Sequence, residues 1–259
     1  MGKYFTVEVK PLIQASYQAA GSAAFAAKDV LFNWTSFDIP RGPAKLLSVN
    51  IVLRGADGAG AANLRDIDLY FAKTLDNGTT QPGSIGNPNA TVSAAPGVAN
   101  HIIGYTKIDN SEYGNDAIDL FNVAQTGSGA GASLIPNLVL EGEPDSGDNV
   151  GYDRLYVAAT ISGSYSFGTT VLCRGAVTAG ADAIPTDKGS DDDPDADLIF
   201  AVGDTIHTAT DDNMGVITAI APFDTNNQAI SVTPGGGAAA NNEELFNINP
   251  IKLVFSFER

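Results

Sequence analysis

Two histidines, His101 and His207, and the single cysteine, Cys173, are the residues best suited to acid–base or nucleophilic chemistry. An imidazole or a thiolate becomes catalytic only when a second group orients or activates it. Neither histidine lies in a nucleophile motif, and Arg174 beside Cys173 favours the thiolate without supplying an orienting base. No serine-hydrolase elbow, paired-histidine zinc motif or Cys/His zinc spacing occurs. The sequence therefore predicts a protein that is not an enzyme and has no catalytic residue.

Three alternating carboxylates, Asp193, Asp195 and Asp197, form the best candidate for a metal site. Carboxylates at this spacing can converge on a hard cation such as Ca²⁺. An EF-hand loop is excluded because it needs glycine at the position of Leu198. We expect either a solvated acidic loop or a calcium site, and no other cofactor. Only a real site would make thermal unfolding respond to EDTA and then to added calcium.

Two pairs of carboxylates raise the alternative of a polysaccharide-degrading enzyme. The pairs are Glu141 with Glu143, and Asp66 with Asp68. Glycoside hydrolysis requires two carboxyl groups that face one cleft. Both pairs alternate along expected strands, so we interpret them as solvated side chains.

Tyrosines near expected loops support a second alternative, a carbohydrate-binding β-sandwich adhesin that recognises a host surface. Such a site needs exposed aromatic rings in a groove. The candidates are Tyr17, Tyr105, Tyr113 and Tyr152. Tyrosines in strands and turns more often serve packing, so this function stays the alternative.

Charge and cysteine content exclude several partners. The 259 residues include 14 Lys and Arg against 30 Asp and Glu, which gives a formal net charge of −16. Such a chain is repelled by phosphates, so we expect no nucleic-acid partner. A single cysteine excludes an intrachain disulfide. We also expect no membrane contact, because no apolar run approaches the roughly 18 residues of a spanning helix. The polar–apolar alternation of residues 3–10 is unlike a signal peptide and favours synthesis in a cytoplasm.

Period-two alternation of apolar and polar residues recurs along the chain and predicts half-buried strands. The first and last segments both show it, so we expect the two chain ends to be strands of one sheet. Phe255 and Phe257 should be core residues of the last strand, and aspartate at either position should abolish folding. The alternating segments are residues 5–10, 48–53, 66–71, 155–161 and 251–258.

Helical signals are scarce. We expect at most a turn or two of helix within residues 19–27 and another at residues 116–123. The polar stretch from residue 76 to residue 100 is rich in Gly, Pro and Asn and predicts a long loop.

A change in composition after Gly168 indicates a second folding unit. Short expected strands at residues 198–202, 205–207, 215–220 and 230–232, with tight turns between them, are typical of a small β-barrel. We therefore predict an all-β fold: a jelly-roll-like β-sandwich formed by residues 1–168 and 248–259, with an inserted small β-barrel at residues 169–247. The insertion separates the penultimate and last strands of the sandwich.

Two segments resemble a known family. WTSFDIPRGPAKLLSV at residues 34–49 and NPIKLVFSFER at residues 249–259 are similar to virion structural proteins of T4-like marine bacteriophages, notably those that infect cyanobacteria. The resemblance covers the amino-terminal sandwich and the last strand and contains no mechanistic motif.

The resemblance implies a location and a role. It implies a capsid decoration protein or a tail, baseplate or fibre subunit, made in the host cytoplasm and found in the virion. It also implies a homo-oligomer whose partners are copies of itself and other virion proteins, joined through loops and sheet edges.

Overall fold

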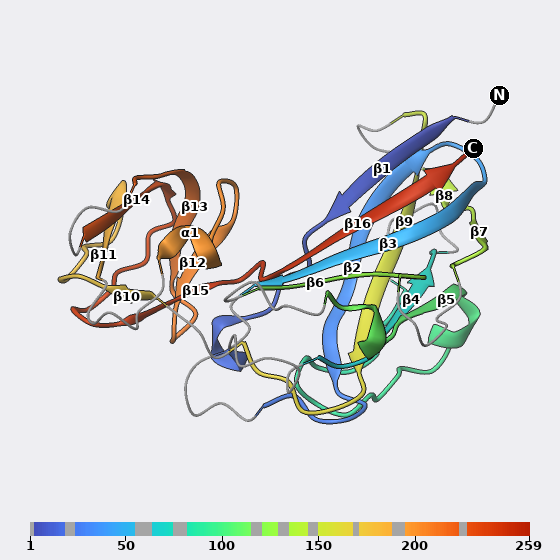
Figure 1. The fold of residues 1–259 in the computed structure, drawn as a ribbon, viewed down its shortest axis with the longest axis horizontal. Helices are drawn as coiled ribbons and strands as arrows, with labels where there is room; N and C mark the ends of the chain where they lie inside the picture. The colour runs from blue at the N-terminus through green and yellow to red at the C-terminus, as the bar shows by residue number, and fades with distance from the viewer. Residues whose placement is uncertain are drawn as a thin grey trace.

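A computed structural model describes residues 3–18, 24–54, 64–74, 82–114, 121–128, 135–144, 150–167, 171–187, 195–222 and 227–259. Within them the chain is nearly all β, with two antiparallel sheets that form a sandwich and one closed barrel (Figure 1).

The first sheet contains both ends of the chain. Its order is β1–β16–β3–β6, and β7 pairs with the part of β3 that β6 does not reach. The antiparallel register between the end strands runs from Tyr4 opposite Glu258 to Val9 opposite Leu253, as the alternation of both segments predicted. The strands are β1 (Tyr4–Val9), β3 (Ala44–Arg54), β6 (Phe121–Gln125), β7 (Leu138–Leu140) and β16 (Ile251–Glu258).

The second sheet packs against the first. Its order is β2–β9–β4–β5, and the short strand β8 pairs with the start of β9. The strands are β2 (Val30–Pro40), β4 (Ile67–Ala72), β5 (Ile102–Ile108), β8 (Glu143–Pro144) and β9 (Tyr152–Ile161).

The connectivity of the eight main strands is that of a jelly roll. Counted along the chain as β1, β2, β3, β4, β5, β6, β9 and β16, they give the sheet orders 1-8-3-6 and 2-7-4-5. This arrangement nests two Greek keys in a double-sheet sandwich. All barrel strands lie in the connection between the seventh and eighth strands. The predicted jelly-roll-like sandwich with an inserted barrel is thus confirmed.

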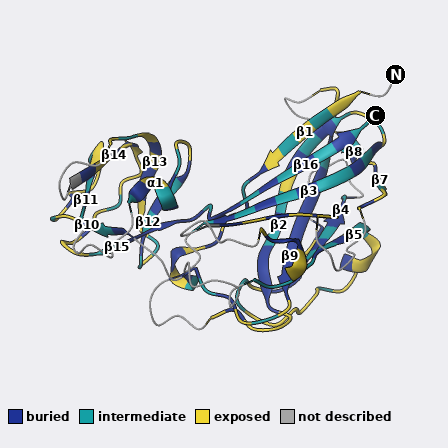
Figure 2. Ribbon diagram, in the orientation of Figure 1, coloured by how far each residue is buried: buried dark blue, intermediate teal, exposed yellow. Residues whose placement is uncertain are grey.

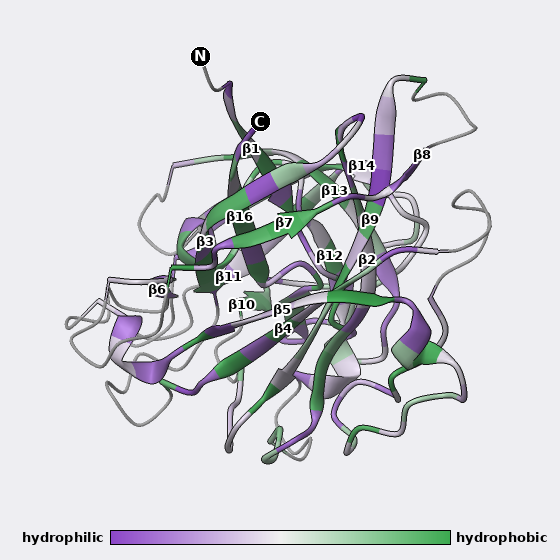
Figure 3. Cartoon of the chain, turned by 90° about the vertical axis from the view of Figure 1, so that its right-hand side faces the viewer, coloured by the Kyte–Doolittle hydropathy of each residue, from purple (hydrophilic) through white to green (hydrophobic). Residues whose placement is uncertain are grey.

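The sandwich core is built from the inward faces of both sheets (Figure 2). In β16 every second residue is buried, and Figure 3 shows hydrophobic and hydrophilic segments along the same strand. Phe255 and Phe257 are fully buried, as predicted. The Phe255 ring lies 5.1 Å from the ring of Phe37 and 5.5 Å from that of Phe71, so it joins the two sheets.

A long segment covers the outer face of the second sheet. Residues 82–100, within the predicted loop, pack Ile85 and Val98 against Trp34 and Tyr156 in a small second cluster. Isolated bridges join Asp29 to Thr91 and Val30 to Pro88 on the same segment. Short 3-10 turns are η1 (Ala15–Tyr17), η3 (Val98–Asn100) and η4 (Asn110–Glu112).

The inserted unit is a closed six-stranded barrel with a separate core. Its strand order is β10–β11–β14–β13–β12–β15. Gly215 has a φ of +132° and an added Cβ would lie 2.3 Å from the Thr233 carbonyl oxygen, so β13 needs glycine there. The elements are β10 (Val171–Cys173), β11 (Ala183–Asp187), α1 (Ala196–Ile199), β12 (Thr205–Thr208), β13 (Asn213–Ile220), β14 (Asn227–Pro234) and β15 (Glu244–Asn247).

Two local predictions were wrong. Residues 198–202 are not a strand, because α1 places Ala196 and Ile199 on one helical face in the barrel core. Of the helical turn expected at residues 116–123, the described part belongs to β6, because pairing with β3 overrides local propensity. In the segment 19–27, residues 19–23 lie outside the described residues, and residues 24–27 are not helical. No helix in the described ranges has the length and apolar character needed to cross a membrane.

Replacing Phe255 with alanine should lower the free energy of unfolding by about 3–5 kcal/mol, because it leaves a cavity between the sheets. Ser256→Ala, one residue away on the opposite face of β16, should change it by less than about 0.5 kcal/mol. Urea unfolding monitored by circular dichroism measures both values. Equal effects of the two substitutions would show that the register of β16 is wrong.

Candidate functional site

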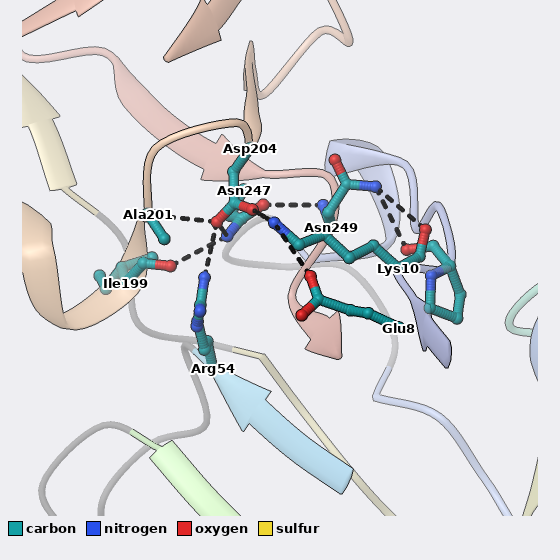
Figure 4. Close-up of polar contacts among 9 residues, drawn as sticks. Glu8, Lys10, Arg54, Ile199, Ala201, Asp204, Asn247 and Asn249 are labelled. Atoms are coloured by element: carbon teal, nitrogen blue, oxygen red, sulfur yellow. Dashed lines mark hydrogen bonds and ion pairs between the residues drawn. The ribbon is translucent and has the colours of Figure 1, made fainter. Parts of the chain in front are cut away.

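Four polar residues from four elements meet where the barrel joins the sandwich (Figure 4). Lys10 directly follows β1, and Arg54 is the last residue of β3. Asp204 lies in the turn before β12, and Asn247 is the last residue of β15. We call these four residues the junction cluster. It combines two sandwich strands with two barrel strands, so it exists only when both units are folded.

The Asp204 carboxylate is the centre of the junction cluster and is fully buried. Its Oδ1 accepts a hydrogen bond from the Lys10 ammonium group at 2.8 Å. Its Oδ2 accepts from Arg54 Nη1 at 2.7 Å, from Asn247 Nδ2 at 2.8 Å and from the Ala201 backbone N–H at 2.9 Å. Three donors therefore reach Oδ2 and one reaches Oδ1, so both oxygens of the buried carboxylate are hydrogen-bonded.

Asn247 extends the network into the backbone around the junction. Its Nδ2 also donates to the Ile199 carbonyl at 3.0 Å, and its Oδ1 accepts from the Asn249 backbone N–H at 2.7 Å. The backbone carbonyl of Asn247 accepts from Gln18 Nε2 at 2.9 Å, and the same nitrogen donates to the Ile13 carbonyl at 2.9 Å. Both amides are buried, so each of these bonds replaces one that water would have made.

Backbone hydrogen bonds hold the chain where it leaves the barrel. The Ile13 N–H donates to the Ile248 carbonyl at 2.8 Å, and the Arg54 N–H donates to the Pro250 carbonyl at 2.8 Å. On the barrel side, the Ile248 N–H donates to the Thr205 carbonyl at 3.1 Å. The return segment is therefore bonded to both units.

This arrangement is suited to an electrostatic contact that holds the two units together, rather than to proton transfer. A buried carboxylate is stable as an anion only when cations and donors replace its hydration. Lys10 and Arg54 supply two positive charges, and Glu8 lies 3.9 Å from Lys10 at the exposed side. Four donors already contact the buried Asp204 carboxylate, so its contacts are those of a structural ion pair.

A cavity of about 320 Å³ adjoins the junction cluster between α1 and the first sheet. Arg54, Lys252 and Asp197 line it together with apolar side chains of Val52, Leu198, Phe200 and Ala201. The charged groups among the described lining residues are two cations and one carboxylate, which is not the set of carboxylates that Ca²⁺ prefers.

The structure does not bring the histidines and the cysteine into one site. Cys173 lies buried in β10 and donates a hydrogen bond to the Gly175 carbonyl at 3.1 Å. Burial, with a smaller contribution from Glu243, raises the pKa of the Cys173 thiol to about 11, so the thiol is protonated at neutral pH. His207 is part of β12 in the barrel, whereas His101 precedes β5 in the sandwich and has its Nδ1 3.0 Å from the Lys73 carbonyl oxygen.

The two carboxylate pairs are engaged separately with other groups. Asp66 lies 2.6 Å from the Lys107 ammonium group, and Asp68 accepts a hydrogen bond from the Tyr105 hydroxyl at 2.7 Å. Glu143 lies 3.7 Å from Lys73, while Glu141 is exposed between β7 and β8. These contacts do not form the opposed pair that glycoside hydrolysis requires.

The structure describes only part of the predicted calcium site. Asp195 precedes α1, and Asp197 is an exposed residue of its first turn. Asp193 lies outside the described residues. The residues that are described contain no group of three His, Cys, Asp or Glu side chains placed to hold a metal ion. The calcium site stays a prediction.

The four candidate tyrosines have different environments. Tyr113 is buried in the sandwich core, where its hydroxyl donates to the Arg65 carbonyl at 3.1 Å. Tyr105 and Tyr152 are 52% and 45% exposed on β5 and β9. Burial and the hydrogen bond to Asp68 raise the pKa of Tyr105 to about 12. Tyr17 lines a groove beside the start of β2.

Sequence reasoning missed the junction cluster. The Gly203-Asp204 turn was predicted, but nothing in its neighbours marks Asp204 as buried. Lys10 and Arg54 look like ordinary charged residues at strand ends. A weak signal was available: Lys10 and Arg54 lie at the ends of expected sandwich strands, and Asn247 is the last residue of the expected insertion.

Replacing Asp204 with asparagine should lower the free energy of unfolding by about 3 kcal/mol, because it leaves two cations facing a neutral amide. We expect the lower end of the 3–5 kcal/mol typical of a broken buried pair, since the Lys10 side chain is 26% exposed. Asp197→Asn, an exposed carboxylate nearby, is the matched control and should change stability by less than about 0.5 kcal/mol. Chemical denaturation measures both. If Asp204→Asn left the free energy of unfolding unchanged, the junction cluster would not hold the two units together.

Acidification should destabilise the barrel through His207. Burial lowers the pKa of His207, while Asp211 and Asp212 oppose this, and its Nδ1 is buried without a hydrogen-bond partner among the described residues. Below the unfolded pKa near 6.5 the unfolded chain therefore binds more protons than the folded one, so stability falls as pH drops. Melting temperatures between pH 7.5 and pH 5.5 should fall more steeply for the unmodified chain than for His207→Gln. Parallel profiles would refute this role of the histidine.

We compared the sequence with family models and with curated proteins. No family model matches the chain, and no curated protein matches it. The resemblance to phage virion proteins therefore stays a prediction, and the function must be argued from the fold and its surfaces.

Proposed function

We propose that this chain is a non-enzymatic structural subunit of a bacteriophage virion, a capsid decoration protein or a component of the tail, baseplate or a fibre. It assembles with copies of itself and with other virion proteins, and contacts neither nucleic acid nor membrane. The observation that carries the proposal is the jelly-roll strand order with a barrel inserted before the last strand. Viral capsid proteins and lectins both use this architecture, so the fold narrows the function without determining it.

The junction cluster supports a role as a rigid building block. A subunit that repeats in an assembly must present its contact surfaces in one fixed relation. Here a buried carboxylate bonded to both units, together with backbone bonds at the return segment, opposes hinge motion between barrel and sandwich.

One side of the sandwich supports contact through sheet edges. β5 ends the second sheet and β6 and β7 end the first, and β5 lies against β7 where Gly104 approaches Leu138. Of the 12 large apolar side chains that are exposed among the described residues, five lie on these strands or just before β7. Figure 3 shows β7 as largely hydrophobic. Exposed apolar edges are favourable sites for association. The five residues are Ile102, Tyr105, Val123, Ile135 and Val139.

Purified protein should form a defined oligomer, and Val139→Lys should weaken that oligomer, because a charge at this edge opposes association. Val139 is 62% exposed, so the subunit fold should survive the change. Val202→Lys is the matched control, since Val202 is also 62% exposed but belongs to the barrel. Light scattering across a range of concentrations, with circular dichroism as the fold check, gives the result.

A chain that stays monomeric at every concentration and joins no particle or polymer would overturn the assembly proposal. An oligomer that Val202→Lys disrupts and Val139→Lys does not would instead move the contact from the sheet edge to the barrel.

A further inference from the structure

A groove of about 390 Å³ lies on the sandwich beside the start of β2. One wall is the segment that ends in η1 and contributes Leu12, Gln14 and Tyr17. The other wall is the covering segment at Asn87 and Pro88. The volume falls within the roughly 300–1,000 Å³ of small-molecule sites.

Hydrogen bonds to β2 hold the second wall in place. Asn33 Nδ2 donates to the Gly86 carbonyl at 3.0 Å, and Asn33 Oδ1 accepts from the Trp34 backbone N–H at 2.9 Å. The Asn89 backbone N–H donates to the Val30 carbonyl at 2.9 Å. The groove is therefore formed before a ligand arrives, which lowers the ordering cost of binding.

Trp34 lines the groove and has an unsatisfied donor. The side chain is only 5% exposed, and its indole N–H is buried with no hydrogen-bond partner in the part of the chain that is described. A buried donor without an acceptor costs on the order of 1–3 kcal/mol, so native proteins rarely keep one without a reason. Because this nitrogen is buried, an oxygen atom of a ligand in the groove could reach it only after the Trp34 side chain shifts.

The other groups around the groove are aromatic or neutral and polar. Tyr17 packs against the sandwich core and presents an aromatic side chain to the groove. Gln14 and Asn87 are exposed, and their side-chain amides make no hydrogen bond to a described residue. None of the described residues that line the groove is charged, although the chain carries a net charge of −16. The ligand should therefore be neutral, with both hydroxyl groups and an apolar face.

We propose that this groove binds a neutral saccharide. Sugar C–H faces pack on an aromatic ring such as Tyr17, while the amides of Gln14 and Asn87 donate to and accept from ring hydroxyls. This site lies on a different surface from the β5–β7 edge, so it neither requires nor excludes the assembly role.

Trp34 is the only tryptophan of the chain, so its fluorescence reports on the groove alone. We would titrate the full chain with the neutral disaccharides maltose, cellobiose, lactose and N,N′-diacetylchitobiose, and measure heat in parallel by calorimetry. At least one should shift the Trp34 emission in a saturable way. Gln14→Ala and Asn87→Ala should each weaken that binding about tenfold, since each removes one or more hydrogen bonds.

Tyr152→Ala is the matched control, because Tyr152 is an exposed tyrosine outside the groove. It should leave the affinity unchanged, and thermal melting should show that all three variants remain folded. Absence of saturable binding to every disaccharide at millimolar concentration would overturn the proposal. So would binding that Tyr152→Ala weakens and the two groove variants do not. Neither result bears on whether the chain assembles.

Discussion

The burial of one carboxylate constrains how the two units of this protein can be joined. Barrel and sandwich have separate hydrophobic cores, so apolar burial alone would permit many relative positions. Asp204 is fully buried, however, and its charge is stable only where Lys10, Arg54 and Asn247 all reach it. Those residues lie at the ends of β1, β3 and β15. The junction cluster therefore forms only when the strands of the sandwich and of the barrel are both correctly paired. The cluster contributes specificity of arrangement more than net stability.

The closing strand depends on the same junction. β16 begins at Ile251, four residues after Asn247, and inserts between β1 and β3, which completes the first sheet. Pairing β1 with β16 joins residues from opposite ends of the chain. The chain therefore loses much conformational entropy on closing this sheet before the burial of the sandwich core can offset the loss. A barrel that folds on its own core brings its two ends, β10 and β15, into neighbouring strands. That folding shortens the effective loop between β9 and β16.

The alternation of apolar and polar residues predicted strands and the side chains that they bury. Strands with one buried face, such as β16, were recovered with their inward residues, and so was the pairing of the chain ends. Where both faces or no face is buried, the pattern is ambiguous: residues 198–202 are all apolar, and an apolar run of that length fits a strand or a buried helical turn. The junction cluster was beyond reach for another reason. Its residues are single members of different elements, and only tertiary topology makes them neighbours. The groove was predicted only in part. Tyr17 was a candidate for carbohydrate binding, but Trp34 and Asn87 line the groove only because the covering segment folds back on β2.

The covering segment, residues 82–100, makes the two sides of the sandwich different. Residues 82–100 shield the outer face of the second sheet, and a sheet that is apolar on both faces requires such a cover. Because Pro88 and Asn89 are tied to Val30, the cover ends in a fixed wall rather than a free loop. Among the described residues no comparable segment covers the first sheet at β6 and β7, where Val123 and Val139 are exposed. One face of the sandwich is thus closed by the chain itself and forms a groove, whereas the opposite edge is left for another surface to close. The groove proposed to bind a saccharide and the edge proposed for assembly therefore lie on different sides of the jelly roll, so one does not block the other.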